Sequence, residues 1–178
     1  MGDPKHPKKK YETPLHPWQR SRMEEETKIL KEFGLKNKTE IWKLRTKWRE
    51  WARLAKKLAS LHTKQSEVEK KQLLEKLHKF GLVEENATVN DVLAIELRDL
   101  FMRRLQSVVV KCKLARSMKQ ARQFIVHKHI LVNGKTMTTP SYLVSIVEEN
   151  KVTFGVTSAL FSLDHPERVK DDGNTTKN

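Results

Sequence analysis

The sequence predicts an α+β protein that is mostly helical: a basic N-terminal arm and a helical region, then two helices, a β-hairpin and a small antiparallel sheet. Apolar residues recur at helical spacing through most of the first 127 positions. An Asn133-Gly134 pair between short β-prone runs is the strongest two-residue hairpin signal. Because only 37% of the 178 residues are hydrophobic, we expect modest packed units that carry long solvated helices.

The first 20 residues predict an extended arm. Four prolines interrupt this stretch and prevent a regular helix. The segment interleaves aromatic side chains, which stack on unpaired bases, with cations, which meet phosphates. These residues are Lys8, Lys9, Lys10, Tyr11, His16, Trp18 and Arg20. We interpret the segment as an arm that binds along RNA, and a solvated tail is the alternative.

Helix signals dominate the stretch from 22 to 82. Two Phe-Gly-Leu sequences, at 33–35 and 80–82, mark helix ends, because glycine adopts the left-handed conformation that terminates a helix. The first of them ends a helix that begins near Arg22. Two capping-box spacings between them mark helix starts, Asn37 with Glu40 and Ser66 with Glu69. We therefore expect two further helices, near 38–61 and 67–80.

The helix expected at 38–61 has one apolar face and one cationic face. The apolar residues are spaced three and four apart: Ile41, Leu44, Trp48, Trp51, Ala55 and Leu58. The other faces carry Lys43, Arg45, Lys47, Arg49, Arg53, Lys56 and Lys57, with Glu50 the only acid from 41 to 66. A merely solvated face alternates signs, as the Glu and Lys pairs of 67–80 do. We assign RNA to the first helix and mainly bulk water to the second, and Trp42 is interpreted either as a base-stacking or as a partly buried residue.

The second half predicts helices first and strands afterwards. Thr88 with Asp91 at its third helical position, and the apolar stripe that follows, predict one helix over 89–111. Ser117 and Gln120 form another capping box, ahead of a shorter helix that ends near 127. The hairpin joins 130–132 to 135–137, and a second strand pair is expected from 143–147 and 151–154.

The charge balance predicts a polyanionic partner. Lysine and arginine total 36 against 22 acids, which gives a formal charge of +14 and a pI near 9.9. RNA, DNA and an anionic membrane all fit, and the membrane fits least because the tryptophans are expected in a buried seam. Cys112, the single cysteine, excludes an internal disulfide and is interpreted as a small core residue. No stretch approaches the roughly 20 apolar residues that span a bilayer, so we expect neither secretion nor membrane insertion.

The helix start at Ser117 is the candidate phosphate site. Free backbone N–H groups and the positive end of the helix dipole suit an anion there, and neighbouring arginines can bind phosphates with two hydrogen bonds. The candidate RNA contacts of this half are Arg103, Arg104, Lys111, Lys113, Arg116, Ser117, Lys119, Gln120, Arg122, Gln123, His127, Lys128, His129, Lys135 and Ser141. His127 and His129 lack further ligands nearby, so structural or phosphate-contacting roles are favoured over metal binding. We expect no metal, no cofactor and no small-molecule substrate.

Several short motifs occur in order between 101 and 163: Arg104-Leu105, Leu114-Ala115-Arg116-Ser117, Ala121-Arg122, Val132-Asn133-Gly134 and Pro140-Ser141. With them the segment resembles the RNA-binding module named after small-subunit ribosomal protein four. Gln106 stands where many relatives have Asp, and Lys128 where many have Gly. The N-terminal half, with Lys-Tyr-Glu-Thr-Pro at 10–14 and His-Pro-Trp at 16–18, resembles the archaeal and eukaryotic type of that ribosomal family.

The resemblance implies a structural constituent of the small ribosomal subunit. It implies direct binding of small-subunit ribosomal RNA, nucleation of subunit assembly, and a contribution to translational accuracy near the place where messenger RNA enters. It also implies neighbouring small-subunit proteins as partners and a cytoplasmic location in the ribosome. A free RNA chaperone or ribosome-rescue factor using the same module is the alternative.

An enzyme is the competing class, because the module also occurs in pseudouridine synthases and tyrosyl-tRNA synthetases. The rest of the chain has no Gly-rich phosphate loop, no Ser/His/Asp arrangement and no metal cluster, so we predict no catalytic activity. The expected organisation is a basic arm at 1–20, a helical RNA-binding region at 21–100, the module at 101–163, and a polar flexible tail at 164–178.

Overall fold

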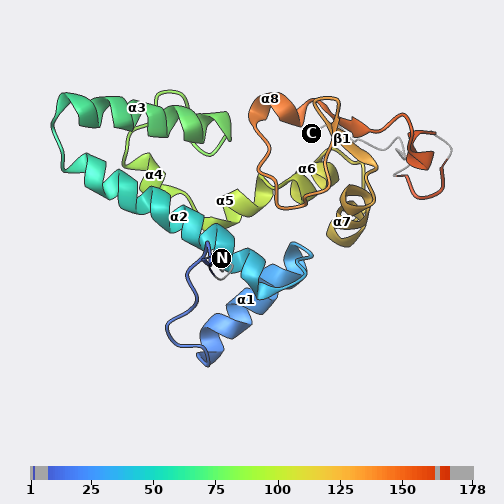
Figure 1. Cartoon of the computed structure of the whole chain (residues 1–178), viewed down its shortest axis with the longest axis horizontal. Helices are drawn as coiled ribbons and strands as arrows, with labels where there is room; N and C mark the ends of the chain where they lie inside the picture. The colour runs from blue at the N-terminus through green and yellow to red at the C-terminus, as the bar shows by residue number, and fades with distance from the viewer. Residues whose placement is uncertain (1, 3–7, 163–164, 169–178) are drawn as a thin grey trace, which may run out of the picture.

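The computed structural model describes residues 2, 8–162 and 165–168. Over these residues the mostly helical α+β fold class is confirmed (Figure 1). The start of the predicted arm, and all of the predicted 164–178 tail except 165–168, lie outside the described residues. From 8 to 19 the arm contains no regular helix or strand, as its prolines lead us to expect.

The N-terminal part, as far as the structure describes it, contains five helices. They are α1 (Arg20–Glu32), α2 (Lys38–Ala59), α3 (Lys64–Lys79), α4 (Asp91–Ala94) and α5 (Leu97–Met102). In Figure 1 the long helix α2 runs diagonally, with α3 folded back beside it and α1 packed against it. The three helices predicted in this region therefore form, with ends within a few residues of those expected.

The C-terminal part consists of short elements around a small sheet. They are α6 (Leu105–Lys111), α7 (Met118–Val126), β1 (Ile130–Val132), β2 (Lys135–Thr136), α8 (Ile146–Glu149), β3 (Val152–Phe154) and a 3-10 turn, η1 (Ala159–Phe161). Strand β1 pairs antiparallel with both β2 and β3. Asn133 and Gly134 have φ values of 56° and 77°, as a type I′ turn requires, which confirms the predicted hairpin.

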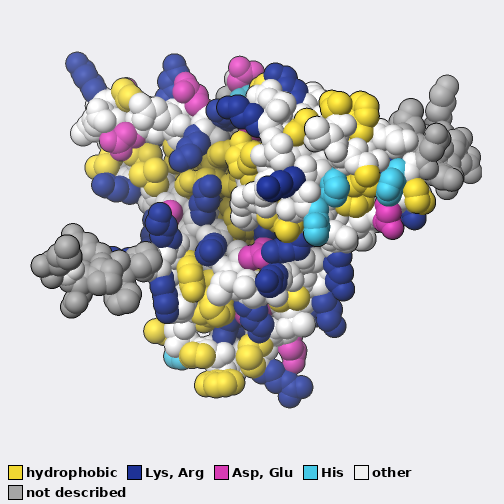
Figure 2. Space-filling model, turned by 45° about the vertical axis from the view of Figure 1, so that its right-hand side comes forward, with side chains coloured by type: hydrophobic (Ala, Val, Ile, Leu, Met, Phe, Trp, Pro, Cys, Tyr) yellow, Lys and Arg dark blue, Asp and Glu magenta, His cyan; other side chains and the backbone are white. Residues whose placement is uncertain are grey.

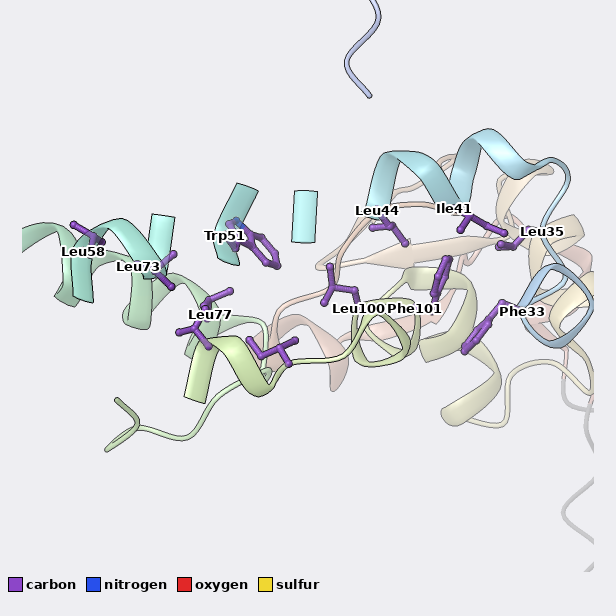
Figure 3. Packing of buried hydrophobic residues seen from close by; sticks show 13 residues of the cluster. Phe33, Leu35, Ile41, Leu44, Trp51, Leu58, Leu73, Leu77, Leu100 and Phe101 are labelled. Atoms are coloured by element: carbon purple, nitrogen blue, oxygen red, sulfur yellow. The ribbon is translucent and has the colours of Figure 1, made fainter. Parts of the chain in front are cut away.

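Two hydrophobic clusters hold these parts together internally. The first follows α2 and buries its predicted apolar face, although Trp48 is only partly buried. Figure 3 shows this cluster as elongated, with Leu58 and Leu73 at one end and Phe33 and Leu35 at the other. The second cluster joins α6 and α7 to the sheet. The two clusters meet where the end of α1 approaches α6 and α7.

Two of the predicted capping boxes are wrong. The side chain of Asn37 makes no cap bond at the start of α2, because its Oδ1 accepts from the Thr39 hydroxyl at 2.6 Å. The carboxylate of Glu40, its expected partner, binds two arginines. At the start of α3 the N-cap is Thr63, and Ser66 is the third helical residue with which it bonds reciprocally. Helix α3 therefore begins three residues earlier than predicted.

The single helix predicted over 89–111 is also wrong, since the segment forms α4, α5 and α6. Glu96 and Asp99 form a capping box that starts α5 anew. Arg104 has extended backbone and makes a β-bridge with Leu143 before α6 begins. The apolar stripe continues through both breaks, so periodicity alone could not reveal them.

The second predicted strand pair does not form. Ser145 and Glu148 bond reciprocally, with the Ser145 N–H donating to the Glu148 carboxylate at 2.9 Å, and this capping box starts α8 within the expected strand at 143–147. The predicted strand at 151–154 does form as β3, but it pairs with β1. The hairpin and β3 therefore share one central strand.

Gly34 lies at the junction between the two clusters. Its φ of +55° is left-handed, and a Cβ built on it would lie 2.9 Å from the Cβ of Met118 in α7. Gly134 in the hairpin has a φ of +77°, but a Cβ there would meet nothing within 4 Å. The two glycines therefore share the backbone requirement and differ in their surroundings.

We expect Gly34→Ala to destabilise the protein more than Gly134→Ala. Both changes cost about 1–2 kcal/mol for the left-handed backbone, and only Gly34→Ala adds a clash, about 1–3 kcal/mol by analogy with overpacked cores. Urea unfolding of the two variants measures the difference. Equal losses of stability would mean that the approach of α1 to α7 does not constrain the fold.

Candidate nucleic-acid interface

The exposed side of α2 carries a cluster of cations that we call the α2 face. It consists of Lys43, Arg49, Arg53, Lys56 and Lys57, all of which are exposed. Within the described part of the chain, the three lysines form no ion pair. Figure 2 shows Lys and Arg side chains distributed over the face of the molecule that it draws, with acids far fewer.

The arm lies against the α2 face. The backbone N–H of Glu12 donates to Thr46 Oγ1 at 2.9 Å, and its carboxylate accepts from Arg49 at 3.1 Å and Arg53 at 3.0 Å. Hydrogen bonds from Arg49 and Arg53 hold the pKa of Glu12 below its ordinary value, so this carboxylate is charged at neutral pH. The predicted arm contacts Lys8, Lys9, Lys10, Trp18 and Arg20 remain exposed, and Tyr11 is half-buried.

Two residues of α2 are less available than the sequence suggested. The ammonium group of Lys47 lies 5.3 Å from the Trp51 ring centre and 5.8 Å from that of Phe80. Burial, and then the nearby charge of Lys76, lower the pKa of Lys47. Trp42 is partly buried, and its indole N–H donates to Glu26 at 3.0 Å. Lys47 therefore contributes to packing, and Trp42 is partly buried, as one of its two interpretations predicts.

The second candidate surface, which we call the α7 face, surrounds the start of α7. It consists of Arg116, Ser117, Lys119, Gln120, Arg122 and Gln123. Ser117 is the N-cap, as predicted, and its hydroxyl accepts the N–H of Gln120 at 3.3 Å. The carboxamide of Gln120 accepts from the N–H of Arg116 rather than from that of Ser117. The predicted N-cap at Ser117 therefore forms. The return bond comes from Arg116, one residue before the position that a regular capping box uses.

A short C-terminal segment crosses the α7 face. The guanidinium of Arg116 donates to the carbonyl oxygens of Pro166 at 2.9 Å and Arg168 at 2.8 Å. Gln120 Nε2 donates to the carboxylate of Glu167 at 2.9 Å. An acidic side chain of the chain itself thus lies beside the helix start where a phosphate was predicted to bind.

Arg104 requires a correction, because its side chain cannot reach a phosphate. It is only 1% exposed and donates to Glu40 at 2.5 Å. The same carboxylate accepts from Arg122 at 2.8 Å, and Arg122 retains one quarter of its side-chain exposure. Burial alone would raise the pKa of Glu40, but hydrogen bonds from Arg122 and Arg104 hold it below the ordinary value. The role of Arg104 is structural.

Arg103 and Lys111 are also engaged within the fold. Both bind the carboxylate of Glu149 in α8, at 2.8 Å and 2.6 Å, and the Arg103 side chain is 13% exposed. Lys111 and Lys113 are exposed, and Lys113 has a left-handed φ of 55° just after α6. Cys112 beside them is half-buried against the second cluster, in line with its predicted packing role.

The remaining predicted contacts follow α7 and the hairpin. His127, Lys128, Lys135 and Ser141 are exposed. His129 Nδ1 lies 2.7 Å from the hydroxyl of Ser158, and burial, with His127 and His165 nearby, lowers its pKa. Lys128 has a φ of 66°, which is the left-handed conformation that favours glycine. Neither histidine belongs to a cluster of metal ligands within the described residues.

Sequence reasoning missed three polar residues that position this interface. Glu40 was assigned to a cap, but it joins α2 to the arginines of α6 and α7. Gln106 Nε2 donates to the carbonyl oxygens of Phe33 at 3.1 Å and Met118 at 2.7 Å. An ionised Asp at this position could not donate either hydrogen bond. Glu26 is buried and binds Arg22 at 2.6 Å. Its position on the inner face of α1 was the one sequence signal for this burial.

The fold and the site define an RNA-binding module of the S4 class, and the S4 domain family matches residues 103–149. Over nearly the whole chain, the small ribosomal subunit protein uS4 of Methanococcus aeolicus is 47% identical over 175 residues, covering 96% of this chain and 99% of the relative. Proteins of the same name from Methanococcus maripaludis (strain C7) and Ignicoccus hospitalis are 46% and 45% identical, covering 95% and 90% of this chain and 96% and 97% of the relatives.

The chain therefore belongs to the family of small ribosomal subunit protein uS4. This is a family of structural RNA-binding proteins and not of enzymes, so membership confirms the predicted lack of catalytic activity. Among the described residues, no helix is long and apolar enough to cross a membrane.

We expect Glu40→Gln to lower the free energy of unfolding by about 3 kcal/mol or more, because it leaves the buried charge of Arg104 uncompensated. The matched control is Glu32→Gln, which removes the acid from an exposed pair with Arg98 and should cost less than about 1 kcal/mol. Urea unfolding at pH 7 compares the variants.

The difference in stability between wild type and Glu40→Gln is predicted to depend on pH. Since the folded-state pKa of Glu40 lies below its ordinary value of 4.5, its stabilisation is complete above that pH and is lost as the pH falls through the lowered value. The stability difference between wild type and Glu40→Gln should therefore narrow in acid. A difference that does not change with pH would contradict an ionised Glu40 in the fold.

Proposed function

We propose that the chain binds small-subunit ribosomal RNA directly, through the arm, the α2 face and the α7 face. The observation that carries the proposal is a set of exposed lysines on the arm, α2 and α7 that have no acidic partner in the described part of the chain, namely Lys8, Lys9, Lys10, Lys43, Lys56, Lys57 and Lys119. Surfaces of this kind neutralise phosphates and recognise the shape of folded RNA. The names of the relatives supply the ribosomal context.

The proposal extends to the role in the subunit. Two parts, 21–100 and 101–163, present one cationic face each, and the Glu40 ion pairs join them. A protein that holds two RNA-binding faces at a fixed angle can bring RNA segments together, which supports nucleation of subunit assembly. We include in the proposal neighbouring small-subunit proteins as partners, a cytoplasmic location, and a contribution to accuracy where messenger RNA enters.

Binding to folded small-subunit ribosomal RNA across a salt series tests the proposal, with an unrelated structured RNA as competitor. We expect Lys43→Ala on α2 and Lys119→Ala on α7 each to reduce the salt slope by about one, because each removes one phosphate contact. The matched control is Lys71→Ala on the mixed-charge face of α3, which should leave the slope unchanged. Binding that the competitor abolishes would favour the alternative, a free RNA chaperone or rescue factor.

The C-terminal segment across the α7 face generates a separate expectation. The Glu167 carboxylate competes with phosphate for the side chains at the start of α7, so Glu167→Gln should strengthen RNA binding. We expect a gain of about 2–5-fold, the value of one charge near a helix terminus. The comparison is made in the same binding assay at low salt, with Glu69→Gln on α3 as the charge-matched control. An unchanged or weaker affinity of Glu167→Gln would mean that RNA does not use this helix start.

A further inference from the structure

A pocket of about 520 Å³ lies between the arm and the first half of α2, and we call it the arm pocket. The arm contributes Thr13, Pro14 and His16, and α2 contributes Trp42, Arg45 and Arg49. It combines an aromatic ring, a proline and several guanidinium groups around one open pocket. The pocket shares Arg49 and Arg53 with the α2 face and adds Trp42 and Arg45 to them.

The walls of the arm pocket are fixed by internal hydrogen bonds. The ring of Trp42 is oriented by its bond to Glu26, which is 3% exposed. Arg22, which also lines the pocket, donates to Glu26 at 2.6 Å and to the carbonyl oxygens of His16 at 3.0 Å and Pro17 at 2.8 Å. The other end of the arm is held by the Glu12 contacts to α2. The pocket is therefore preorganised, which lowers the cost of binding a ligand.

The charge of the arm pocket favours an anion. Arg45, Arg49 and Arg53 line it at intervals of four residues along α2, whereas Glu12 is the only acid in its wall. Glu12 binds Arg49 and Arg53, but Arg45 forms no ion pair with any described residue. A donor for a ligand is thus left in the wall at Arg45.

The size and the aromatic wall narrow the choice of anion. A volume of about 520 Å³ exceeds what a bare phosphate needs and lies in the range of pockets that hold small organic ligands. Trp42 provides a ring on which a base can stack, and Leu15, 88% exposed, adds an apolar edge. A double helix cannot enter a pocket of this size, whereas a single base turned out of its stack can.

We propose that the arm pocket binds one unpaired nucleotide of RNA, with its base against the Trp42 ring and its phosphate on the Arg45 guanidinium. The proposal rests on the proposed RNA-binding function and adds a base-recognising site to it. The α2 and α7 faces meet phosphates and read shape, while the arm pocket reads the presence of an unstacked base.

The test uses the full chain and the NMR signal of the Trp42 indole N–H, identified by its loss in Trp42→Phe. The four nucleoside 5′-monophosphates and inorganic phosphate are titrated separately. We expect at least one monophosphate to shift this signal saturably with a dissociation constant of about 1 mM or tighter, and phosphate to shift it less. Arg45→Ala should weaken the monophosphate about 10-fold or more, because a charged hydrogen bond is lost.

Two control variants separate the pocket from general charge. Arg45→Lys keeps the charge but loses the planar fork, so its affinity should lie between those of wild type and Arg45→Ala. Arg98→Ala removes an exposed arginine outside the pocket and should change the monophosphate affinity by less than about two-fold. An equal loss in Arg98→Ala and Arg45→Ala would overturn the assignment to Arg45.

Other outcomes of the titration would rule out a nucleotide site or identify a different ligand. If no monophosphate saturates the Trp42 signal, or if phosphate alone shifts it as much, the pocket is not a nucleotide site. Single-stranded RNA tetranucleotides should bind more tightly than monophosphates, and a blunt RNA duplex should leave the signal unchanged. Monophosphates that bind more tightly than every tetranucleotide would identify a free nucleotide as the ligand. The salt slopes of the Lys43 and Lys119 variants are independent of this signal, so the pocket can fail while the proposed function stands.

Discussion

The Glu40 carboxylate, shared by Arg104 of the α6 start and Arg122 of α7, determines how the two parts of the molecule lie relative to each other. Arg104 is almost fully buried, and a buried guanidinium is tolerated only next to a compensating acid. The first turn of α2 suits that acid, because the positive end of the helix dipole also favours it. Gln106 strengthens the same junction by donating to carbonyl oxygens at the end of α1 and the start of α7. The position of the α7 face beside α2 follows from these few contacts.

The placement of acids explains how a chain with a formal charge of +14 folds and still presents cations outward. Several glutamates point inward onto arginines at the joints of the fold: Glu26 onto Arg22, Glu40 onto Arg104, and Glu149 onto Arg103. Lys38 and Lys111 join two of these pairs, at Glu26 and at Glu149. These three acids therefore stabilise the fold, while the exposed lysines of the arm and α2 have no acidic partner among the described residues.

Local signals predicted the regular elements well. The glycine at 34 ended α1, the serine at 117 capped α7, and the Asn133-Gly134 turn formed the hairpin, because each depends on backbone conformation within a few residues. The breaks at Glu96 and Arg104 were missed because the apolar stripe runs through them. Ser145 and Glu148 also have the spacing of a capping box, but the sequence analysis predicted only a strand from 143 to 147 there.

The candidate site was predictable in its composition and not in its geometry. Exposed lysines of α2 and α7 followed from charge runs on amphipathic helices, since such helices bury only their apolar side. The burial of Arg104, and the use of Arg103 for Glu149, depend on residues 40 or more positions away. The arm pocket likewise forms because Arg22 holds the backbone at His16 and Pro17 while Glu12 reaches α2. No local pattern specifies such long-range pairs.

The proposed interface combines two kinds of recognition that differ in their physical cost. Exposed lysines would gain affinity from counterion release, which every RNA provides, so they would contribute little discrimination between RNAs. A preorganised pocket with an oriented ring would add affinity only for an RNA that offers an unstacked base. That base would also have to lie at the right distance from the phosphates that the lysines contact. The fixed junction at Glu40 matters for this reason, because it keeps the α7 face at a constant distance from α2 and from the pocket beside it. A flexible junction would leave the affinity of each surface intact and remove the geometric requirement that one RNA satisfy them together.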